Sequence, residues 1–415
     1  MASNMSSSLI MRIVSASVAV SNRASQIIRE VMKKGDLGII EKGKNDFQTE
    51  ADRSAQRCIV ASLHKQFPKV SIFGEEGETF VLDRTRLHRP HFAFPTISTP
   101  LSPKQNIWTQ LGPEKIPADF IELGFSEDVL KHDCPKFLED VKDEQIVIWV
   151  DPLDGTAEYT QGFLDHVTVL IGIAVDGHAV GGVINQPFYN YQEEDKVMGR
   201  CIWGVCQLGA YGFTREVLPE DKLILTTSRS HSNRMVTEAV EALNPSEVVR
   251  VGGAGHKVLL LIEGKVHAYI FATKGCKKWD TCAPEAILHA VGGTLTDMFG
   301  ITMSYGPNVK RLNAGGVLAT TSNHQYFVSK VPEHVLENLE KSESPEPLAG
   351  GICLRGDNKG CLGEVREEEQ EIEQQTEQKM EQQVEQKEEP SLSPKGSESP
   401  SSDTGIAREN LDTKL

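Results

Sequence analysis

The chain has 415 residues, of which 39% are hydrophobic and 25% are charged, and its net charge is −16. This length allows two domains or one large layered domain with an ample core. The negative charge argues against a broad electrostatic surface for nucleic acid, but it permits a small phosphorylated substrate bound through a metal ion. We therefore expect no nucleic-acid partner. No apolar run approaches the roughly 18 residues of a membrane-spanning helix, so we also expect no membrane partner.

The first elements in chain order are amphipathic helices and short strands. Residues 9–35 have helical spacing up to Gly35, and Arg12 interrupts their apolar run, which favours a first helix over a signal peptide. A strand at 38–41, a helix at 49–67 and a strand at 70–73 are predicted next.

The piece from about 84 to 115 differs in character. It is rich in Pro, His and Thr and shows no period. A structureless segment of this length is unusual inside a compact domain. We predict a poorly ordered insertion here, with a mobile flap over the acidic site as the alternative.

The remaining folded part has two kinds of pattern. Apolar runs at 167–173, 179–184 and 201–205 predict an antiparallel meander. After residue 223 the pattern alternates, which predicts a second, α/β half. The predicted strands are 223–226, 248–251 and 268–271, and the predicted helices are 232–243, 255–263 and 282–291. We therefore expect one folded domain at 1–340, with halves at about 7–215 and 216–340.

Residues 341–415 are of a different class. The stretch 364–389 holds eleven Glu and three basic residues, and Ser, Pro and Gly follow it. Such a composition does not bury enough apolar surface to become ordered. We predict a disordered acidic tail whose partner the sequence does not identify.

Two acidic clusters are the most informative feature of the chain. Glu75 and Glu76 follow the apolar run 70–73, and Asp151 and Asp154 follow the run 146–150. Carboxylates at the end of a buried strand are costly unless a cation neutralises them, and Mg²⁺ prefers such hard oxygen ligands. A solvated surface turn is the alternative, which the buried strand in front of the second cluster disfavours.

The segment 151–156 also predicts a phosphate site. Pro152 biases the preceding residue toward an extended backbone, and an Asp-Gly turn follows. In such a turn Asp151, the carbonyl of Leu153 and Asp154 face one point. The next two residues present backbone N–H groups at a helix start, which is a favourable place for an anion.

Further candidates lie in four other segments. Asp52 stands in the first turn of a predicted helix and Asp280 stands before the last one; read alone, each is a helix-start acid or cap. Segments 226–231 and 252–257 each join a strand to a helix with hydroxyls or glycines and a cation nearby. Such turns are typical of phosphate binding, although a plain tight turn explains a glycine cluster equally well.

Taken together, these motifs resemble the lithium-sensitive, Mg²⁺-dependent phosphatase superfamily of inositol monophosphatase and fructose-1,6-bisphosphatase. The motifs are Thr-x-Ala-Asp at 49–52, Gly-Glu-Glu at 74–76, Asp-Pro-Leu-Asp-Gly-Thr at 151–156 and Trp-Asp-Thr-Cys-Ala-Pro-Glu at 279–285. The stretches 183–191, 227–233 and 251–257 are most similar to its bisphosphate nucleotidase branch. The resemblance covers about 9–76 and 146–335, and therefore neither the insert nor the tail.

The resemblance implies a fold, a reaction and a set of site residues. The fold is α/β (α+β), a layered αβαβα sandwich, and the reaction is hydrolysis of adenosine 3′,5′-bisphosphate to AMP and phosphate, with the sulfated analogue as a further substrate. Two or three Mg²⁺ ions are implied, with ligands Glu75, Asp151, the Leu153 carbonyl, Asp154 and Asp280. The implied water-activating pair is Asp52 and Thr156. The implied substrate contacts are Gly155, Thr156, Ser228, His231, Gly253 and Lys257.

Two other functions stay open at this point. One is an inositol polyphosphate 1-phosphatase or inositol monophosphatase. The other is a catalytically inactive nucleotide-binding module, which the presence of Asp52 and Thr156 disfavours because a binder does not need them. The scattered cysteines predict a reducing, cytoplasmic location, and we expect a monomer.

Overall fold

The computed structural model describes residues 7–43, 46–76, 79–80, 121–219, 221–348 and 352–354, all within one structural unit. The predicted insert at 84–115 lies outside the described residues, as does the predicted tail beyond residue 354. No helix within the described ranges is long and apolar enough to span a membrane.

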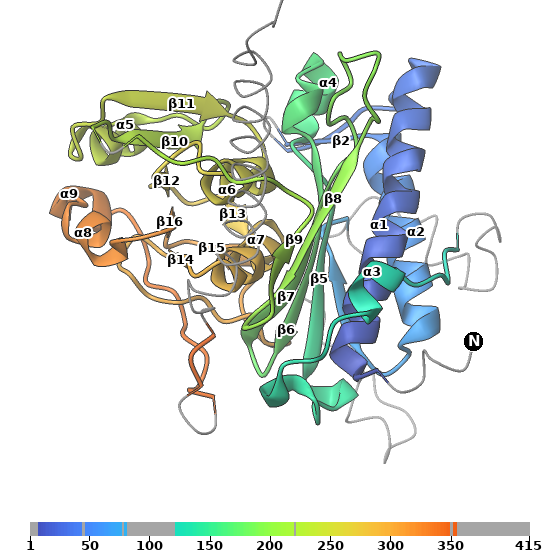
Figure 1. Cartoon of the computed structure of the whole chain (residues 1–415). Coiled ribbons are helices and arrows are strands. Elements are labelled where there is room, and N and C mark those ends of the chain that lie inside the picture. The colour runs from blue at the N-terminus through green and yellow to red at the C-terminus, as the bar shows by residue number, and fades with distance from the viewer. Residues whose placement is uncertain are drawn as a thin grey trace, which may run out of the picture. The chain divides into compact units, whose positions relative to one another are not determined.

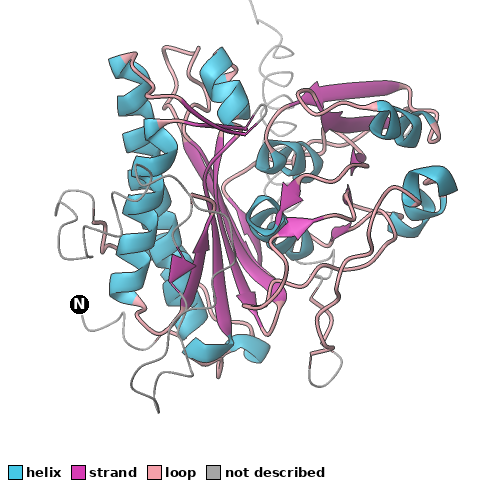
Figure 2. Cartoon of the chain, turned by 180° about the vertical axis from the view of Figure 1, so that it is seen from behind, coloured by secondary structure: helices cyan, strands magenta, loops and turns pink. Residues whose placement is uncertain are grey.

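The helices and sheets stack in five layers (Figures 1 and 2). The first layer is α1 (Leu9–Lys34) and α2 (Glu50–Gln66), and the middle layer is α6 (Ala254–Ile262) and α7 (Lys278–Ala290). The last layer is α5 (Arg234–Glu241), α8 (His324–Ser329) and α9 (Glu333–Leu336). One β-sheet lies between the first and the middle helix layer, and a second β-sheet lies between the middle and the last helix layer. The predicted αβαβα sandwich is therefore confirmed.

The first sheet has seven strands in the order β4-β3-β5-β6-β7-β8-β9. Its strands are β3 (Ser71–Gly74), β4 (Thr79–Phe80), β5 (Ile146–Asp154), β6 (Thr168–Val175), β7 (His178–Gln186), β8 (Arg200–Val205) and β9 (Gly209–Tyr211). β3 and β5 are parallel, whereas β5 to β9 form an antiparallel meander. The two acidic clusters therefore stand at the ends of two parallel neighbours.

The second sheet has five strands in the order β11-β10-β12-β16-β14. Its strands are β10 (Ile224–Ser228), β11 (Glu247–Val251), β12 (Ala268–Phe271), β14 (Thr294–Thr296) and β16 (Val317–Thr320). β10 is parallel to both β11 and β12, in keeping with the alternating pattern of the sequence. Two small pairs complete the strands of the described ranges: β1 (Ile40–Gly43) with β2 (Asp46–Gln48), and β13 (Cys276–Lys277) with β15 (Leu312–Asn313).

Short helices connect these parts. They are α3 (Glu127–Leu130), α4 (Thr156–Gln161) and the 3₁₀ helices Lys136–Leu138, Asp143–Gln145 and Leu164–His166. α4 follows β5 directly, so it begins where the second acidic cluster ends.

β5 is buried on both faces. Ile146, Ile148 and Val150 pack in the core beneath α1 and α2, whereas Val147 and Trp149 pack in the core around α6 and α7. A strand covered on both sides has a continuous apolar sequence, because neither set of alternating side chains meets water. This strand delivers Asp151 and Asp154 from the interior of the molecule.

α7 rests directly on the main chain of the seven-stranded sheet. Gly172 and Gly182 are paired across β6 and β7. A Cβ at Gly172 would lie 2.6 Å from the Ala283 nitrogen, and one at Gly182 would lie 2.5 Å from the Ala283 oxygen. The absence of a side chain at both positions therefore fixes how closely α7, with Asp280 in its first turn, approaches β5.

α7 begins at Lys278, four residues before the predicted start at Cys282. Lys277 is its N-cap, and Asp280 at the third helical position accepts the Lys277 N–H at 2.8 Å. Pro284 lies inside the helix and does not mark its beginning. Packing of Cys282 and Ala283 on the sheet accounts for a helix that the local sequence does not favour.

The chain beyond residue 340 has no helix or strand among its described residues, but it stays in contact with the folded unit. The Ser342 N–H donates to Asp297 Oδ2 at 2.8 Å, and the Glu343 carbonyl accepts the Ser304 N–H at 2.9 Å. The domain boundary at residue 340 stays a prediction.

Candidate active site

The two aspartates of β5 emerge at an irregularity in the strand. Asp151 pairs with Leu170 and Asp154 pairs with Thr168, so β5 carries one more residue here than β6. Such a bulge tolerates Pro152, which has no N–H for the ladder. The bulge turns this end of β5 toward the pocket, and Asp151 Oδ1 accepts the N–H of Leu153 at 3.1 Å.

Gly155 makes the turn from β5 into α4. Its φ of +89° lies in the left-handed region, which favours glycine. Thr156 is then the first residue of α4, and its side chain points back toward β5. Its Oγ1 donates to the Leu153 carbonyl at 3.1 Å and to Asp52 Oδ1 at 2.9 Å.

Asp52 lies behind Thr156 and is buried. It is the third residue of α2, where its Oδ2 accepts the Thr49 N–H at 2.7 Å and the Thr49 hydroxyl. Burial raises the pKa of Asp52 to about 6, and these hydrogen bonds oppose part of that rise. The predicted pair of Asp52 and Thr156 is thus in direct contact, from elements about a hundred residues apart in sequence.

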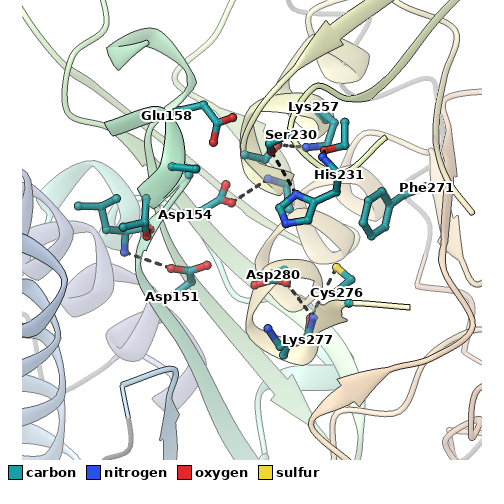
Figure 3. A pocket seen from close by; sticks show the side chains of 18 of the residues that line it. Asp151, Asp154, Glu158, Ser230, His231, Lys257, Phe271, Cys276, Lys277 and Asp280 are labelled. Carbon is teal, nitrogen blue, oxygen red and sulfur yellow. Dashed lines mark hydrogen bonds between the residues drawn. The ribbon is translucent and has the colours of Figure 1, made fainter. Parts of the chain in front are cut away.

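Asp154 connects the end of β5 to the first turn of α6. Its Oδ1 accepts the N–H of Ala254 at 2.8 Å, and its Oδ2 accepts the N–H of Gly255 at 2.8 Å and the hydroxyl of Thr168 at 2.6 Å. The first turn of α6 therefore holds this carboxylate from the opposite side of the pocket (Figure 3).

The first acidic cluster faces Lys42 of β1. The Lys42 ammonium lies 3.3 Å from Glu75 and 2.9 Å from Glu76. The amide of Gln48 also donates to Glu76. Burial, followed by the charge of Glu75, raises the pKa of Glu76 to about 7.

One cavity of about 340 Å³ collects the predicted site residues. Asp52 is behind its wall, and all the others line it: Glu75, Asp151, Leu153, Asp154, Gly155, Thr156, Ser228, His231, Gly253, Lys257 and Asp280. Figure 3 shows Asp151 and Asp154 on one side of the cavity, Lys257, His231 and Phe271 on the other, and Asp280 below and between them. Their roles stay predictions, but the convergence of residues this far apart in the sequence does not follow from any local pattern.

The acids of the cavity disfavour one another's charge. Burial raises the pKa of Asp151 well above its usual range, and the charges of Glu75, Asp154 and Asp280 add to the rise. Burial and the charge of Glu75 raise the pKa of Asp280 to about 7. Ionisation of these groups at neutral pH therefore calls for a cation.

The donor set of the cavity fits Mg²⁺ by its chemistry. It consists of carboxylate and carbonyl oxygens, which are the ligands of hard cations. Over the ranges that the structure describes, no three His, Cys, Asp or Glu side chains form a ready-made metal cluster. The fit therefore rests on the donor types and on the mutual repulsion of the acids.

Some lining residues were not predicted. Phe271 and His231 stand edge to face, with ring centroids 6.4 Å apart and an interplanar angle of 83°. Tyr269 lines the same cavity two residues earlier on β12. The period of two within the predicted strand 268–271 was a signal for this aromatic wall. Phe47 also lines the cavity, but its hairpin reaches the site only through tertiary contacts.

The raised pKa values predict that the metal-free protein loses stability as the pH rises. Asp280 and Glu76 have pKa values of about 7 in the folded protein, whereas carboxyls of an unfolded chain titrate near 4. Between these values the unfolded chain binds fewer protons, so the free energy of unfolding contributed by these groups falls. Thermal melts in chelator should show a lower Tm at about pH 7 than at about pH 5. Mg²⁺ at about a hundredfold its Kd should add about 2.7 kcal/mol at the higher pH.

Asp280→Asn is the matched control for this titration. It removes one of the groups, so the decline of Tm with pH should become shallower, and added Mg²⁺ should raise the Tm less. A wild-type Tm that responds neither to pH in this range nor to Mg²⁺ would contradict the prediction.

Comparisons with known proteins agree with the architecture and the motifs. A model described as the Inositol monophosphatase family matches residues 11–85 and 110–336. The protein "3'(2'),5'-bisphosphate nucleotidase 1" of Homo sapiens is 48% identical over 336 residues, which is 80% of this chain and 98% of the human protein. Its namesake from Dictyostelium discoideum is 36% identical over 329 residues, which is 77% of this chain and 96% of that one.

A solved structure supports the fold. The native crystal structure of extragenic suppressor protein suhB from Bartonella henselae matches with a TM-score of 0.52 and 18% identity. The match covers 77% of this chain and 97% of that chain.

Proposed function

The chain belongs to the inositol monophosphatase family, and from this premise we propose that it is a Mg²⁺-dependent phosphomonoesterase that hydrolyses adenosine 3′(2′),5′-bisphosphate to AMP and phosphate. The 48% identity to the human bisphosphate nucleotidase over nearly all of that protein supports this substrate. The single observation that carries the reaction is the convergence of buried acids and the Asp52–Thr156 pair on one cavity. The sulfated analogue 3′-phosphoadenylyl sulfate is a second proposed substrate.

The reacting phosphate is proposed to lie at the start of α4. There Gly155 and Thr156 present main-chain N–H groups at the floor of the cavity. Thr156 Oγ1 stands between this position and Asp52. Thr156 accepts a proton from the attacking water and passes its own to the carboxylate of Asp52, so the water is oriented and deprotonated from one side.

Mg²⁺ is the proposed cofactor, since the family is generally Mg²⁺-dependent and the oxygen donors of the cavity suit it. The proposed ligands are Glu75, Asp151, the carbonyl of Leu153, Asp154 and Asp280, for two or three ions. Bound Mg²⁺ supplies neutralisation of the phosphate charge and a lowered pKa of a coordinated water.

The remainder of the nucleotide is proposed to occupy the side of the cavity formed by the C-terminal half. Ser228 is the last residue of β10, and His231 follows it closely. The Ser228 hydroxyl accepts the main-chain N–H of His231 at 3.1 Å. Gly253 and Lys257 come from the start of α6, and the Lys257 ammonium donates to the Gly253 carbonyl at 2.5 Å. Phe271, in edge-to-face contact with His231, adds an aromatic ring to this side of the cavity, and such a wall suits a nucleobase.

Three wider properties are proposed. The free thiols of the described cysteines agree with a reducing, cytoplasmic location. We further propose a monomer with a folded phosphatase domain at about 1–340, followed by an acidic tail at 341–415.

Competing phosphate monoesters test the proposed substrate. Purified protein with Mg²⁺ should release phosphate from adenosine 3′,5′-bisphosphate with a kcat/KM at least about a hundredfold above that on inositol 1,4-bisphosphate. We expect this because a site built for one set of polar groups discriminates strongly against a ligand that lacks them. The opposite ranking would favour the inositol phosphatase alternative, and binding without phosphate release would favour the inactive nucleotide-binding module.

A further inference from the structure

A tight turn joins β11 to α6, and its second residue, Gly253, lines the cavity. The turn consists of Gly252 and Gly253, and Gly253 has a φ of +69°. A Cβ on Gly253 would lie 2.5 Å from the carbonyl oxygen of His166. The turn therefore packs main chain against main chain on the segment that contains His166.

The His166 side chain holds the same turn by a hydrogen bond. The N–H of Gly252 donates to His166 Nδ1 at 3.2 Å. Acceptance at Nδ1 requires the neutral ring with its proton on Nε2. Burial lowers the pKa of His166, which favours this neutral form.

The ring of His166 is fixed by its neighbours. It stacks on Phe163 with an interplanar angle of 11° and a centroid distance of 6.0 Å. It also contacts the ring of His256, with a centroid distance of 4.8 Å. A ring with this packing is preorganised to accept one hydrogen bond in one direction.

Two groups of the proposed site depend on the conformation of this turn. The next two N–H groups, of Ala254 and Gly255, bind the carboxylate of Asp154. The carbonyl of Gly253 accepts the ammonium of Lys257. Figure 3 shows Asp154 and Lys257 facing the cavity from opposite sides. His166 is not among the residues that line the cavity.

We infer that His166 is a positioning residue, which sets the Gly252–Gly253 turn so that Asp154 and Lys257 face the cavity together. The inference rests on the proposed roles of those two residues. The segment 156–166 thus begins with Thr156 at the proposed phosphate position. It ends with His166, which orients the part of the cavity that is proposed to hold the rest of the nucleotide.

His166→Leu, His166→Asn and His267→Leu test this inference. Leu removes the acceptor, whereas Asn offers Oδ1 close to the position of Nδ1. His267 is the matched control, because its Nδ1 accepts a main-chain N–H in the same way, from Ile224 at 3.1 Å. Neither His267 nor Ile224 lines the cavity. Each protein is assayed for kcat and KM on adenosine 3′,5′-bisphosphate and for the rise in Tm on addition of Mg²⁺.

His166→Leu should lower kcat/KM by about a hundredfold, with a higher KM and a lower kcat, because a displacement of about 1 Å has this effect in a preorganised site. Its Mg²⁺-induced rise in Tm should also be smaller than that of the wild type. His166→Asn should recover most of both losses. His267→Leu should lower the Tm but keep the wild-type kcat, KM and response to Mg²⁺.

Three results would overturn the inference: a His166→Leu protein with wild-type kinetics and Mg²⁺ response, an Asn variant as impaired as the Leu variant, or an equal loss in His267→Leu. Failure of the proposed function is distinguishable from these, because the wild type itself would then not hydrolyse the nucleotide. The comparison of Mg²⁺-induced Tm shifts tests the inference in that case too.

Discussion

Asp154→Asn is expected to lower kcat by about a thousandfold, because it removes a fixed negative charge from the place where the reaction needs preorganised electrostatics. It also disturbs the carboxylate's surroundings. Both oxygens of Asp154 accept main-chain N–H groups, from Ala254 and Gly255. An amide has only one acceptor oxygen, so one of these N–H groups would face the NH₂ group of Asn. Steady-state kinetics and a Mg²⁺ titration followed by Tm would measure both consequences.

Thr168→Val separates charge from hydrogen bonding in this test. The Thr168 hydroxyl is the third donor to Asp154, at 2.6 Å. Valine keeps the shape and leaves the carboxylate charged, so kcat should stay within about tenfold of the wild type, as expected for loss of one hydrogen bond of about 1 kcal/mol. Wild-type turnover in Asp154→Asn, or an equal loss in Thr168→Val, would end the assignment of Asp154 as a metal ligand.

Thr156→Val is expected to lower kcat by about two to four orders of magnitude, the usual contribution of a positioned proton-transfer group. The Thr156 hydroxyl lies 2.9 Å from Asp52 Oδ1, and valine replaces it with a methyl group of similar size. Thr156→Ser restores the hydroxyl and should recover most of the activity. Rapid-quench measurement of phosphate release would separate the chemical step from product release.

The same pair predicts the acidic side of the pH profile. Asp52 must be ionised to accept a proton, and its pKa is raised to about 6. Wild-type kcat should therefore fall as the pH decreases through about 6 and level off above it. In Thr156→Val the residual rate no longer depends on proton transfer to Asp52, so this decline should disappear. A decline of equal size in both proteins would contradict the pairing.

The strands that bear the acids were predictable because burial on both faces leaves a continuous apolar run. Ile146 to Val150 have no polar residue, and the acids begin where the run ends. The start of α7 was not predictable in the same way. Pro284 favours a helix that starts near it, and only the packing of the helix on Gly172 and Gly182 explains why it already begins at Lys278.

The composition of the site was predictable residue by residue, but the contacts between its distant segments were not. Asp154 meets Ala254 and Gly255 across about a hundred positions of sequence, and no local pattern encodes that contact. The same holds for Phe47 and Lys42, which the β1–β2 hairpin brings to the acids. The aromatic pair of His231 and Phe271 depends on the parallel pairing of β10 and β12.

The contact of α7 with the two paired glycines has a consequence for how this protein tolerates change. Ordinary cores contain a layer of side chains that absorbs substitutions by repacking. Between Ala283 and the glycines no such layer exists, so the separation of Asp280 from β5 is a main-chain dimension. Substitutions elsewhere in the interior can alter the stability of the protein while the distance from Asp280 to β5 stays the same. One added methyl group at Gly182 would instead push α7 and Asp280 outward together.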